Sequence, residues 1–378
     1  MSMERNAGLD VIRTLAIGLV LLSHGAYVFT SSCASLRSSL WKMEVFGYLG
    51  VEVFFVLSGF LIGAILLRLF TNARCTPLPA LLGNFYLRRW YRTLPLYYLM
   101  LAVNVFFWEW AEGWQLFSVG HVSWQYVLFL QNYYLAPGVF FPESWSLAVE
   151  EWFYLLFPVG MAMAVRRGGE KRLGIVIFTF IVCVLAVRIF YVHWEMAEFD
   201  SGVRKNIFLR LDSLAIGVLL AYVAMWKPER LRRIASWWRL AVLFLAGVCG
   251  YFWLVGWNGW NQSFFARTLM LSLVSVSCAV LVAKAYLHVG LTGGVRSFFY
   301  WMSTLSYAMY LVHLPVFVTT MFLLQGVASL AAALGALGAD LCLIVAFSYA
   351  LHWFFERPMM RLRPQEIREE AASCPKGL

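Results

Sequence analysis

Charged residues are scarce in this 378-residue sequence. Asp, Glu, Lys and Arg make up 13% of it, against roughly 25% in an ordinary soluble domain. Hydrophobic residues make up 62% of the sequence, and the mean hydropathy is +0.72. This composition excludes a typical soluble domain and indicates an all-α polytopic membrane protein.

Cysteine pairs with metal-ligand spacing are also missing. The seven cysteines are scattered, mostly within apolar runs, and no C-x-x-C motif occurs. They are Cys33, Cys75, Cys183, Cys249, Cys278, Cys342 and Cys374. This pattern favours neither a disulfide framework nor a metal site. Internal repeats and low-complexity linkers are absent as well, so we expect one membrane domain over residues 1–360 and a cytoplasmic tail over 361–378.

Ten apolar runs are present, each long enough to cross ~30 Å of hydrocarbon. They are Val11–Thr30, Phe46–Leu69, Phe85–Phe107, Trp145–Val165, Leu173–Trp194, Phe208–Trp226, Trp237–Trp257, Phe264–Leu287, Phe298–Leu324 and Ala331–Phe355. We expect a bundle of about ten transmembrane helices. The first run is interrupted by charge, which argues against a cleaved signal peptide and for a permanent span.

Basic residues account for the net charge of +10, and they cluster between the apolar runs. This pattern is typical of cytoplasmic loops rather than of a nucleic-acid surface. The clusters around Arg88 and around Arg166 must then be separated by an even number of crossings. The intervening segment Val122–Tyr134 is short and polar, so we predict a re-entrant or interfacial segment there. The same alternation places both termini in the cytoplasm.

Two ionisable residues interrupt the first apolar run. Arg13 and His24 are eleven positions apart, so they share one helix face and lie roughly 16 Å apart along the axis. A charged side chain facing lipid costs ~2.5 kcal/mol or more, and such residues normally face a protein interior or a wet cavity. We therefore expect this helix to line a functional site, with Arg13 toward its cytoplasmic end and His24 in its outer half.

Five other motifs place polar residues in or beside apolar runs. They are Glu52 and Ser58 in GVEVFFVLSGFLI, Arg88, Arg89 and Arg92 in FYLRRWYRTLP, Ser146, Glu150 and Glu151 in SWSLAVEEWFYLLFP, Arg210 and Asp212 in RLDSLAIG, and Tyr310 and His313 in LSYAMYLVHLP. Arg88 and Arg92 are i,i+4 neighbours, and Arg89 is expected on another helix face.

Each motif also has a purely structural interpretation. The three arginines of the third run could serve only to orient the protein in the membrane. Glu150 and Asp212 could each pair with an arginine, and His313 could be hydrogen-bonded within the bundle. Ser58 could bond back to its own helix, and the small residues around it suit close helix packing. His24 has no such explanation within its own helix.

The combination of Arg13 and His24 with the motifs of the second, third, fourth and ninth runs resembles the acyltransferase-3 family of integral membrane O-acyltransferases. The five matches lie in the family's order and cover nearly the whole chain. The resemblance implies transfer of an acyl group, usually acetyl, from cytoplasmic acyl-CoA to a hydroxyl of a glycan, commonly at the bacterial envelope. It also implies that Arg13 and His24 are an essential pair. Some relatives carry an appended extracytoplasmic hydrolase-like domain, which we expect this chain to lack.

Acyl transfer to an alcohol needs a base for the hydroxyl proton and a cation or donor for the developing oxyanion. We expect His24 to be the general base or a transient acyl carrier, oriented by Glu150 or Asp212. The CoA phosphates are assigned to four arginines: Arg13, Arg88, Arg89 and Arg92. The substrate path is assigned to Ser58, Ser146, Arg210, Tyr310 and His313.

These assignments require no permanently bound cofactor and no metal, because acetyl-CoA or another acyl-CoA is a co-substrate. The expected partners are acyl-CoA, a glycan or other hydroxyl acceptor and the lipid bilayer of a bacterial inner membrane, with no nucleic acid. The sequence leaves a homo-oligomer open. The rival hypothesis is a transporter or proton-coupled carrier, since buried Arg, His and Glu also line permeation paths. A carrier commonly has related halves, and none are evident.

Overall fold

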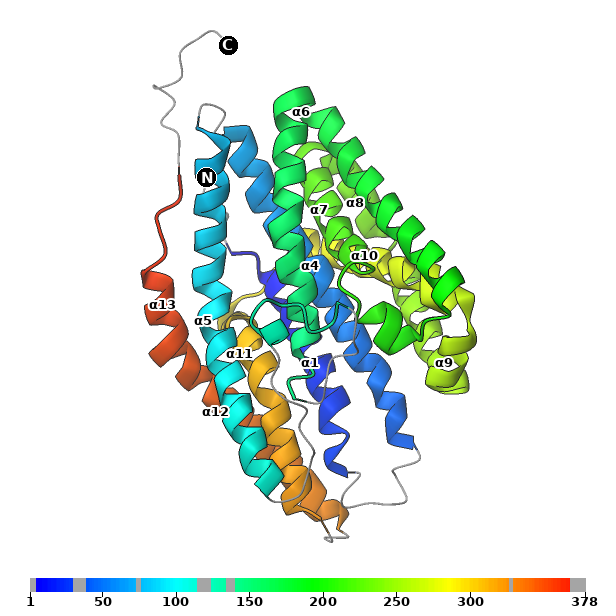
Figure 1. Ribbon diagram of the computed structural model, residues 1–378, viewed down its shortest axis with the longest axis vertical. Coiled ribbons are helices and arrows are strands. Elements are labelled where there is room, and N and C mark those ends of the chain that lie inside the picture. The colour runs from blue at the N-terminus through cyan, green and yellow to red at the C-terminus, as the bar shows by residue number, and fades with distance from the viewer. Residues whose placement is uncertain are drawn as a thin grey trace.

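The computed structural model describes residues 5–29, 39–72, 76–113, 124–133, 140–325 and 329–367, with the backbone alone at 72, 108–113 and 164–171. Within these ranges the chain is helical and has no β-strand, as the sequence predicts (Figure 1). Its α-helices are α1 (Ala7–Gly25), α4 (Glu44–Asn72), α5 (Leu78–Gly113), α6 (Ser144–Glu195), α7 (Leu211–Trp226), α8 (Pro228–Ser236), α9 (Trp238–Gln262), α10 (Leu271–His288), α11 (Gly293–Leu323), α12 (Leu330–Leu351) and α13 (Arg357–Arg361).

Short turns of 3-10 or π-helix join several of these helices. They are η1 (Trp41–Met43), η2 (Trp124–Tyr126), η3 (Phe199–Arg204), η4 (Ala266–Met270) and η5 (His352–Glu356). Some residues named above lie outside the described part of the chain. They are Cys33, Cys75, Cys374, residues 368–378 of the tail and the side chains of Arg166, Arg167 and Lys171.

Seven stretches of the described residues are long and apolar enough to cross a membrane. They are Ala7–Gly25, Trp41–Thr71, Arg172–Glu195, Trp238–Gln262, Ala266–His288, Gly293–Leu323 and Leu330–Arg361. The three other predicted spans fall on α5, on the first part of α6 and on α7, which are helical. The chain is therefore an all-α polytopic membrane protein, and the count of about ten spans stays a prediction.

Helix α6 contains 52 residues, which corresponds to about 78 Å at 1.5 Å per residue. That length exceeds twice the ~30 Å hydrocarbon thickness. Figure 1 shows its first part rising beside α5 and its later part descending in a different direction toward α9. The helix therefore bends back on itself, and its ~78 Å are divided between two arms that cover the fourth and the fifth predicted spans.

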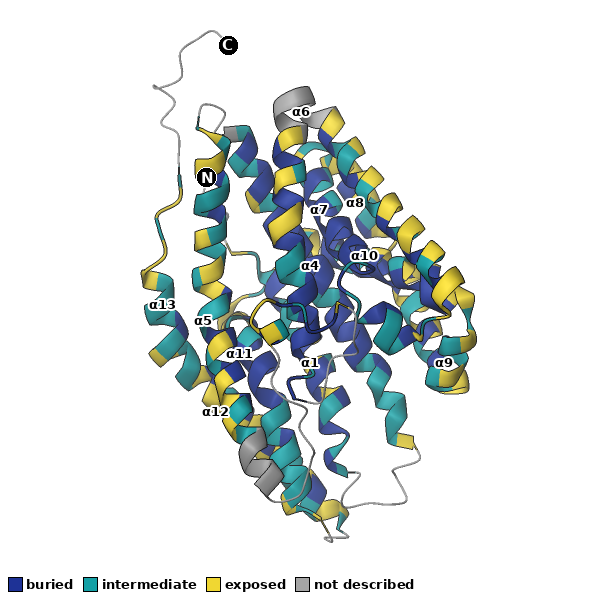
Figure 2. Ribbon diagram, in the orientation of Figure 1, coloured by how far each residue is buried: buried dark blue, intermediate teal, exposed yellow. Residues whose placement is uncertain are grey.

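The crossing of α4 and α7 lies in the interior of the bundle, where Figure 2 shows many buried residues. A Cβ atom on Gly59 would lie 2.0 Å from the Leu214 carbonyl oxygen, and one on Gly217 would lie 2.1 Å from the Val56 carbonyl oxygen. The two backbones are thus in direct contact through glycine. Small residues permit this approach in membrane helices, as the sequence around Ser58 predicts.

The outer helices expose large apolar side chains. Leu254 of α9 is 85% exposed, and Phe354 beside α12 is 84% exposed. A soluble protein rarely presents contiguous apolar surface of this kind. These outward faces are suited to contact with lipid.

The segment Val122–Tyr134 does not form a spanning helix in its described part, residues 124–133. It consists of the single turn η2 followed by hydrogen-bonded turns. Tyr97 donates its hydroxyl to the Tyr126 carbonyl at 2.8 Å, and the Gln131 amide donates to the Ser144 carbonyl at 3.1 Å. Hydrogen bonds of polar side chains therefore hold this segment against α5 and against the first turn of α6.

The two ends of the described chain lie on one side of the bundle. Asn6, the N-cap of α1, donates to the Tyr286 carbonyl near the end of α10 at 3.0 Å. Near the other end, Arg5 and Arg357 line one cavity. That this side is cytoplasmic stays a prediction.

Candidate active site

A cavity of about 430 Å³ lies between α1, α4, α5, α6, α11 and the η5–α13 segment. Its volume is within the ~300–1,000 Å³ range of small-molecule sites. Seven of the predicted site residues line it, and these are Arg13, Ser58, Arg89, Arg92, Ser146, Glu150 and Tyr310. The fold thus gathers residues from five separate motifs around one space.

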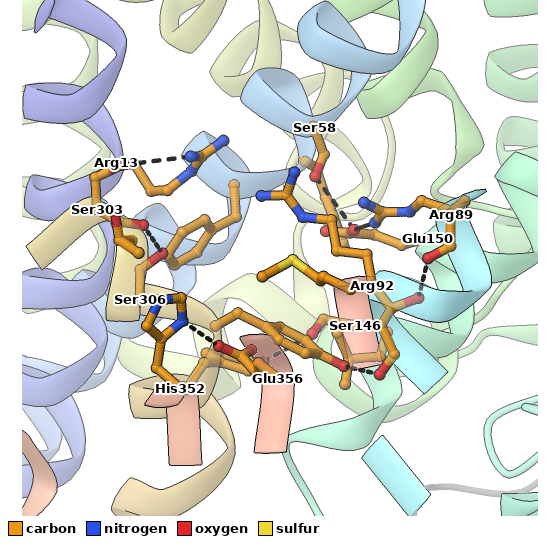
Figure 3. Close-up of a pocket in the computed structure, with 18 of the residues that line it drawn as sticks. Arg13, Ser58, Arg89, Arg92, Ser146, Glu150, Ser303, Ser306, His352 and Glu356 are labelled. Carbon is orange, nitrogen blue, oxygen red and sulfur yellow. Dashed lines mark hydrogen bonds and ion pairs between the residues drawn. The ribbon is translucent and has the colours of Figure 1, made fainter. Parts of the chain in front are cut away.

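Guanidinium groups dominate one part of the cavity. Figure 3 shows Arg13, Arg89 and Arg92 extending into the same region beside Ser58. Arg13 comes from α1 and donates through Nη1 to Ser303 Oγ at 3.3 Å. With Arg5 and Arg357, five arginines line the cavity against three glutamates. The wall therefore has two more guanidinium groups than carboxyl groups and is suited to an anion.

Arg88 lies outside this cavity. Its Nη1 donates to the Pro364 carbonyl at 2.8 Å, and its Nη2 lies 3.9 Å from a carboxylate oxygen of Glu366. The predicted face assignment was therefore wrong, because the cavity residues of α5 are Arg89 and Arg92, which are three positions apart. Side chains three apart and four apart can both share a helix face, so the neighbouring elements decide which pair faces inward.

Glu150 forms the polar centre of the wall opposite Arg13. Its Oε2 accepts from the Tyr154 hydroxyl at 2.7 Å and from Ser58 Oγ at 3.2 Å, and it pairs with Arg89 at 3.4 Å. The Arg89 guanidinium also lies 4.3 Å from the centroid of the Tyr154 ring. Glu150 therefore positions Arg89, and it does not orient His24 as predicted.

His24 is hydrogen-bonded to a second histidine. Its Nδ1 lies 2.8 Å from Nε2 of His313, and the ring centroids are 4.9 Å apart. The partner residues are 289 positions apart in the sequence and come from α1 and α11. One of the two nitrogens must carry the hydrogen, so the tautomer of one ring fixes that of the other.

Tyr310 stands between this histidine pair and the cavity. Its ring centroid is 5.7 Å from that of His313, and its hydroxyl is 2.8 Å from Ser146 Oγ. Tyr310 and Ser146 line the cavity, whereas His24 and His313 are not among its lining residues. The pair is thus one aromatic side chain away from the cavity wall.

The family of this chain follows from a comparison of its sequence with family models. A model described as an acyltransferase domain matches residues 6–353. The chain belongs to this acyltransferase domain family. The matched region includes the histidine pair and most of the residues that line the cavity, whereas Arg5, Glu356, Arg357 and Met360 lie outside it.

Curated relatives with O-acetyltransferase names match most of the domain. The peptidoglycan O-acetyltransferase OatA of Listeria monocytogenes is 29% identical over 292 residues, which cover 72% of this chain and 45% of that protein. The O-acetyltransferase OatA of Staphylococcus aureus is 26% identical over 335 residues, covering 82% of this chain and 50% of that protein. The chain spans about half the length of the curated relatives it matches. No solved structure matches it.

Arg210 and Asp212 lie elsewhere in the acyltransferase domain. Asp212 accepts from both terminal nitrogens of Arg188, at 3.1 and 2.9 Å, and Arg210 pairs with Glu52. All four side chains are fully buried. Asp212 also accepts from Ser272 at 2.6 Å. The prediction that Asp212 orients His24 is corrected, because its carboxylate is already occupied by a structural ion pair, and Arg210 lines no part of the cavity described above.

Several cavity residues escaped the sequence analysis. His352 and Glu356 of η5 are joined by a 2.9 Å contact between Nδ1 and Oε2, and Figure 3 shows them opposite the guanidinium groups. Thr93 and Tyr307 also line the cavity and were not predicted. Thr93 donates its hydroxyl to Glu151, which belongs to the predicted fourth motif, at 3.1 Å, and Tyr307 donates to the Thr93 carbonyl at 2.9 Å. The sequence does contain a signal for His352 and Glu356. They are four positions apart at the end of the last apolar run, which places both on one helix face.

Proposed function

We propose that this protein is a membrane O-acyltransferase, and specifically an O-acetyltransferase, of a bacterial inner membrane. It moves an acyl group, acetyl in the first instance, from cytoplasmic acyl-CoA to a hydroxyl of a cell-envelope glycan. Membership of the acyltransferase domain family supports the reaction class, and the names of the OatA relatives support peptidoglycan as the first acceptor to test. The structural observation that carries the proposal is the arginine-rich cavity next to the His24–His313 pair.

The cavity binds the anionic part of the donor in this proposal. Arg13, Arg89 and Arg92 contact the CoA phosphates, because guanidinium groups form strong charge-assisted bonds with phosphate oxygens. Nε of Arg89 is buried with no hydrogen-bond acceptor among the described residues, so this guanidinium retains donor capacity. Arg5 and Arg357, which line the cavity, lie near the two ends of the described chain, on the predicted cytoplasmic side.

Separate residues carry out the chemical step. Arg13 and His24 lie on the single helix α1, roughly 16 Å apart along its axis, so one residue cannot serve both the phosphates and the reacting carbonyl. The donor therefore extends from the arginines toward Tyr310 and the histidine pair. Its charged group stays at the arginines while the thioester approaches His24.

The histidine pair transfers the proton of the acceptor hydroxyl to the leaving thiolate. When Nδ1 of His24 donates to His313, Nε2 of His24 keeps a free lone pair and takes the proton of the acceptor hydroxyl. The hydroxyl oxygen forms a bond to the thioester carbon, and the carbon–sulfur bond breaks. The proton then passes from His24 to the leaving thiolate. The products are an O-acyl glycan and CoA with a free thiol.

The deciding experiment is transfer by purified, monodisperse protein in nanodiscs, with isotope-labelled acetyl-CoA and peptidoglycan fragments. We expect wild type to release free CoA thiol and to label the acceptor. His24→Ala should reduce transfer by ~10²–10⁴-fold, as expected for loss of a general base. His313→Gln should keep more activity than His313→Leu, because an amide oxygen still accepts from His24.

His193→Ala is the matched control, because His193 is exposed on α6 and away from the cavity. It should transfer acetyl at the wild-type rate. Near-normal turnover by His24→Ala would remove the histidine from the chemistry. Wild-type protein that moves a solute across proteoliposomes but transfers no acyl group would instead support the carrier hypothesis.

A further inference from the structure

A second cavity lies away from the acyl-donor site, between α8, the start of α9 and the end of α10. Its volume is about 520 Å³. It is lined by Arg232, Ala235, Ser236, Trp238, Arg239, Lys284, Leu287 and His288. Three of these residues are permanently basic and one is a histidine, and this lining, which lies wholly within the described residues, includes no carboxylate. None of its residues lines the first cavity.

We propose that this second cavity binds the phosphate headgroup of an anionic phospholipid. The proposal does not depend on the acyltransferase function, because it concerns different residues on a different part of the bundle. The ligand chemistry is a phosphate diester that carries a net negative charge and two acyl chains.

The position of the cavity favours a lipid over a soluble anion. Helix α9 begins at Trp238 and α10 ends at His288, and both belong to candidate membrane spans. The cavity therefore lies where two spans reach the headgroup level. Just beyond it on α9, Leu240 and Leu243 are 59% and 69% exposed. These side chains are placed to contact the acyl chains of a lipid whose headgroup occupies the cavity.

Two of the basic side chains in the cavity lie beside the same aromatic ring. The Arg239 guanidinium lies 5.5 Å and the Lys284 ammonium 6.0 Å from the Trp238 ring centroid. Both lie within the distance at which an aromatic ring attracts a cation. Both cations therefore lie beside one indole and line the same cavity, so an anion bound there interacts favourably with both.

Three helix ends also border the cavity, and one of them is the start of α9. Its N-terminus, at Trp238, has no side-chain cap hydrogen bond. The first backbone N–H groups of a helix lack partners within the helix, and the helix dipole places partial positive charge there. Helices α8 and α10 end at the same cavity, at Ser236 and His288, where the helix dipole places partial negative charge, so the attraction for a phosphate rests on the basic side chains. Clusters of this kind at the ends of membrane helices bind anionic headgroups.

The experiment is a titration of the purified protein in detergent with phosphatidylglycerol and, separately, with phosphatidylcholine. Bound lipid is counted by native mass spectrometry, and the thermal unfolding midpoint is recorded. We expect wild type to retain phosphatidylglycerol and to unfold at higher temperature with it, and to show neither effect with phosphatidylcholine. The double variant Arg239→Gln/Lys284→Gln should bind phosphatidylglycerol about tenfold or more weakly.

The matched control removes two positive charges from the same region without entering the cavity. Arg230 and Arg233 are exposed on α8 and do not line it. Arg230→Gln/Arg233→Gln should bind phosphatidylglycerol like wild type. Equal losses in the two double variants would show a diffuse charge effect and overturn the site. Inorganic phosphate that displaces phosphatidylglycerol at matched ionic strength, where chloride does not, would overturn the lipid assignment in favour of a soluble phosphate.

Discussion

At the scale of single residues, the direction in which an arginine side chain points decides whether it lines the proposed donor cavity. Arg88 and Arg92 are one helical turn apart on α5, yet Arg92 lines the cavity and Arg88 contacts residues 364 and 366. Both are arginines beside an apolar run, so local sequence gives them the same expected role. Their different surroundings offer a direct test of the donor site.

We predict that Arg92→Gln weakens acetyl-CoA binding about tenfold or more, because a charge-assisted hydrogen bond contributes roughly 1.5–3 kcal/mol. Arg88→Gln on the same helix should bind acetyl-CoA like wild type, since Arg88 does not line the cavity. Calorimetric titration of the purified variants measures both affinities. An equal loss of affinity in the two variants would contradict the assignment of the donor phosphates to this cavity.

At the scale of helices, two buried ion pairs hold α7 against its neighbours. Asp212 of α7 pairs with Arg188 of α6, and Arg210, which precedes α7, pairs with Glu52 of α4. Ser275 of α10 also donates to Glu52, at 3.0 Å. Breaking one partner of such a pair leaves a buried charge uncompensated, whereas replacing both partners with apolar groups is often tolerated.

Asp212→Asn should therefore destabilise the protein by ~3–5 kcal/mol, the cost of leaving Arg188 buried without its partner. The double variant Arg188→Met/Asp212→Leu should recover the folded yield and most of the acetyl transfer. Size-exclusion profiles and unfolding midpoints in detergent report the first effect, and turnover reports the second. A well-folded double variant with no transfer would return Asp212 to the chemistry.

At the scale of the whole molecule, the two ends of the described chain lie on one side of the bundle, which makes the predicted topology testable. Asn6 lies beside Tyr286, and Arg5 and Arg357 line a common cavity. The same-side arrangement agrees with an even number of crossings. Among the described residues, seven stretches meet the length and hydropathy requirement by themselves, and the remaining predicted spans lie on α5, α6 and α7.

Topology reporters placed after Leu378 and between Arg166 and Arg172 should both report the cytoplasm. A reporter inserted after Gln262, at the end of α9, should report the outside. Fusions to alkaline phosphatase and green fluorescent protein in intact cells distinguish the two compartments. Opposite compartments for the first two reporters would contradict the predicted ten-span arrangement.

The sequence alone determined which parts of the chain are helical and which residues deserve attention. Apolar length and the position of basic clusters are properties of contiguous residues, so they can be read without knowing how helices pack. Burying a charged group in a membrane is costly, and this cost alone identifies candidate functional residues within an apolar run. It identified Arg13, His24, Arg89, Arg92 and Glu150. The short polar segment at Val122–Tyr134 was also recognisable, because it lacks the length of a span.

Only the tertiary structure decided how these residues are paired. The contact of His24 with His313 joins positions 289 apart, and that of Asp212 with Arg188 joins α7 to α6. The choice of Arg89 over Arg88 as a wall residue depends on what packs against each face of α5. Helical periodicity fixes which residues share a face, but the neighbour of that face is set by long-range packing, such as the glycine contact of α4 with α7.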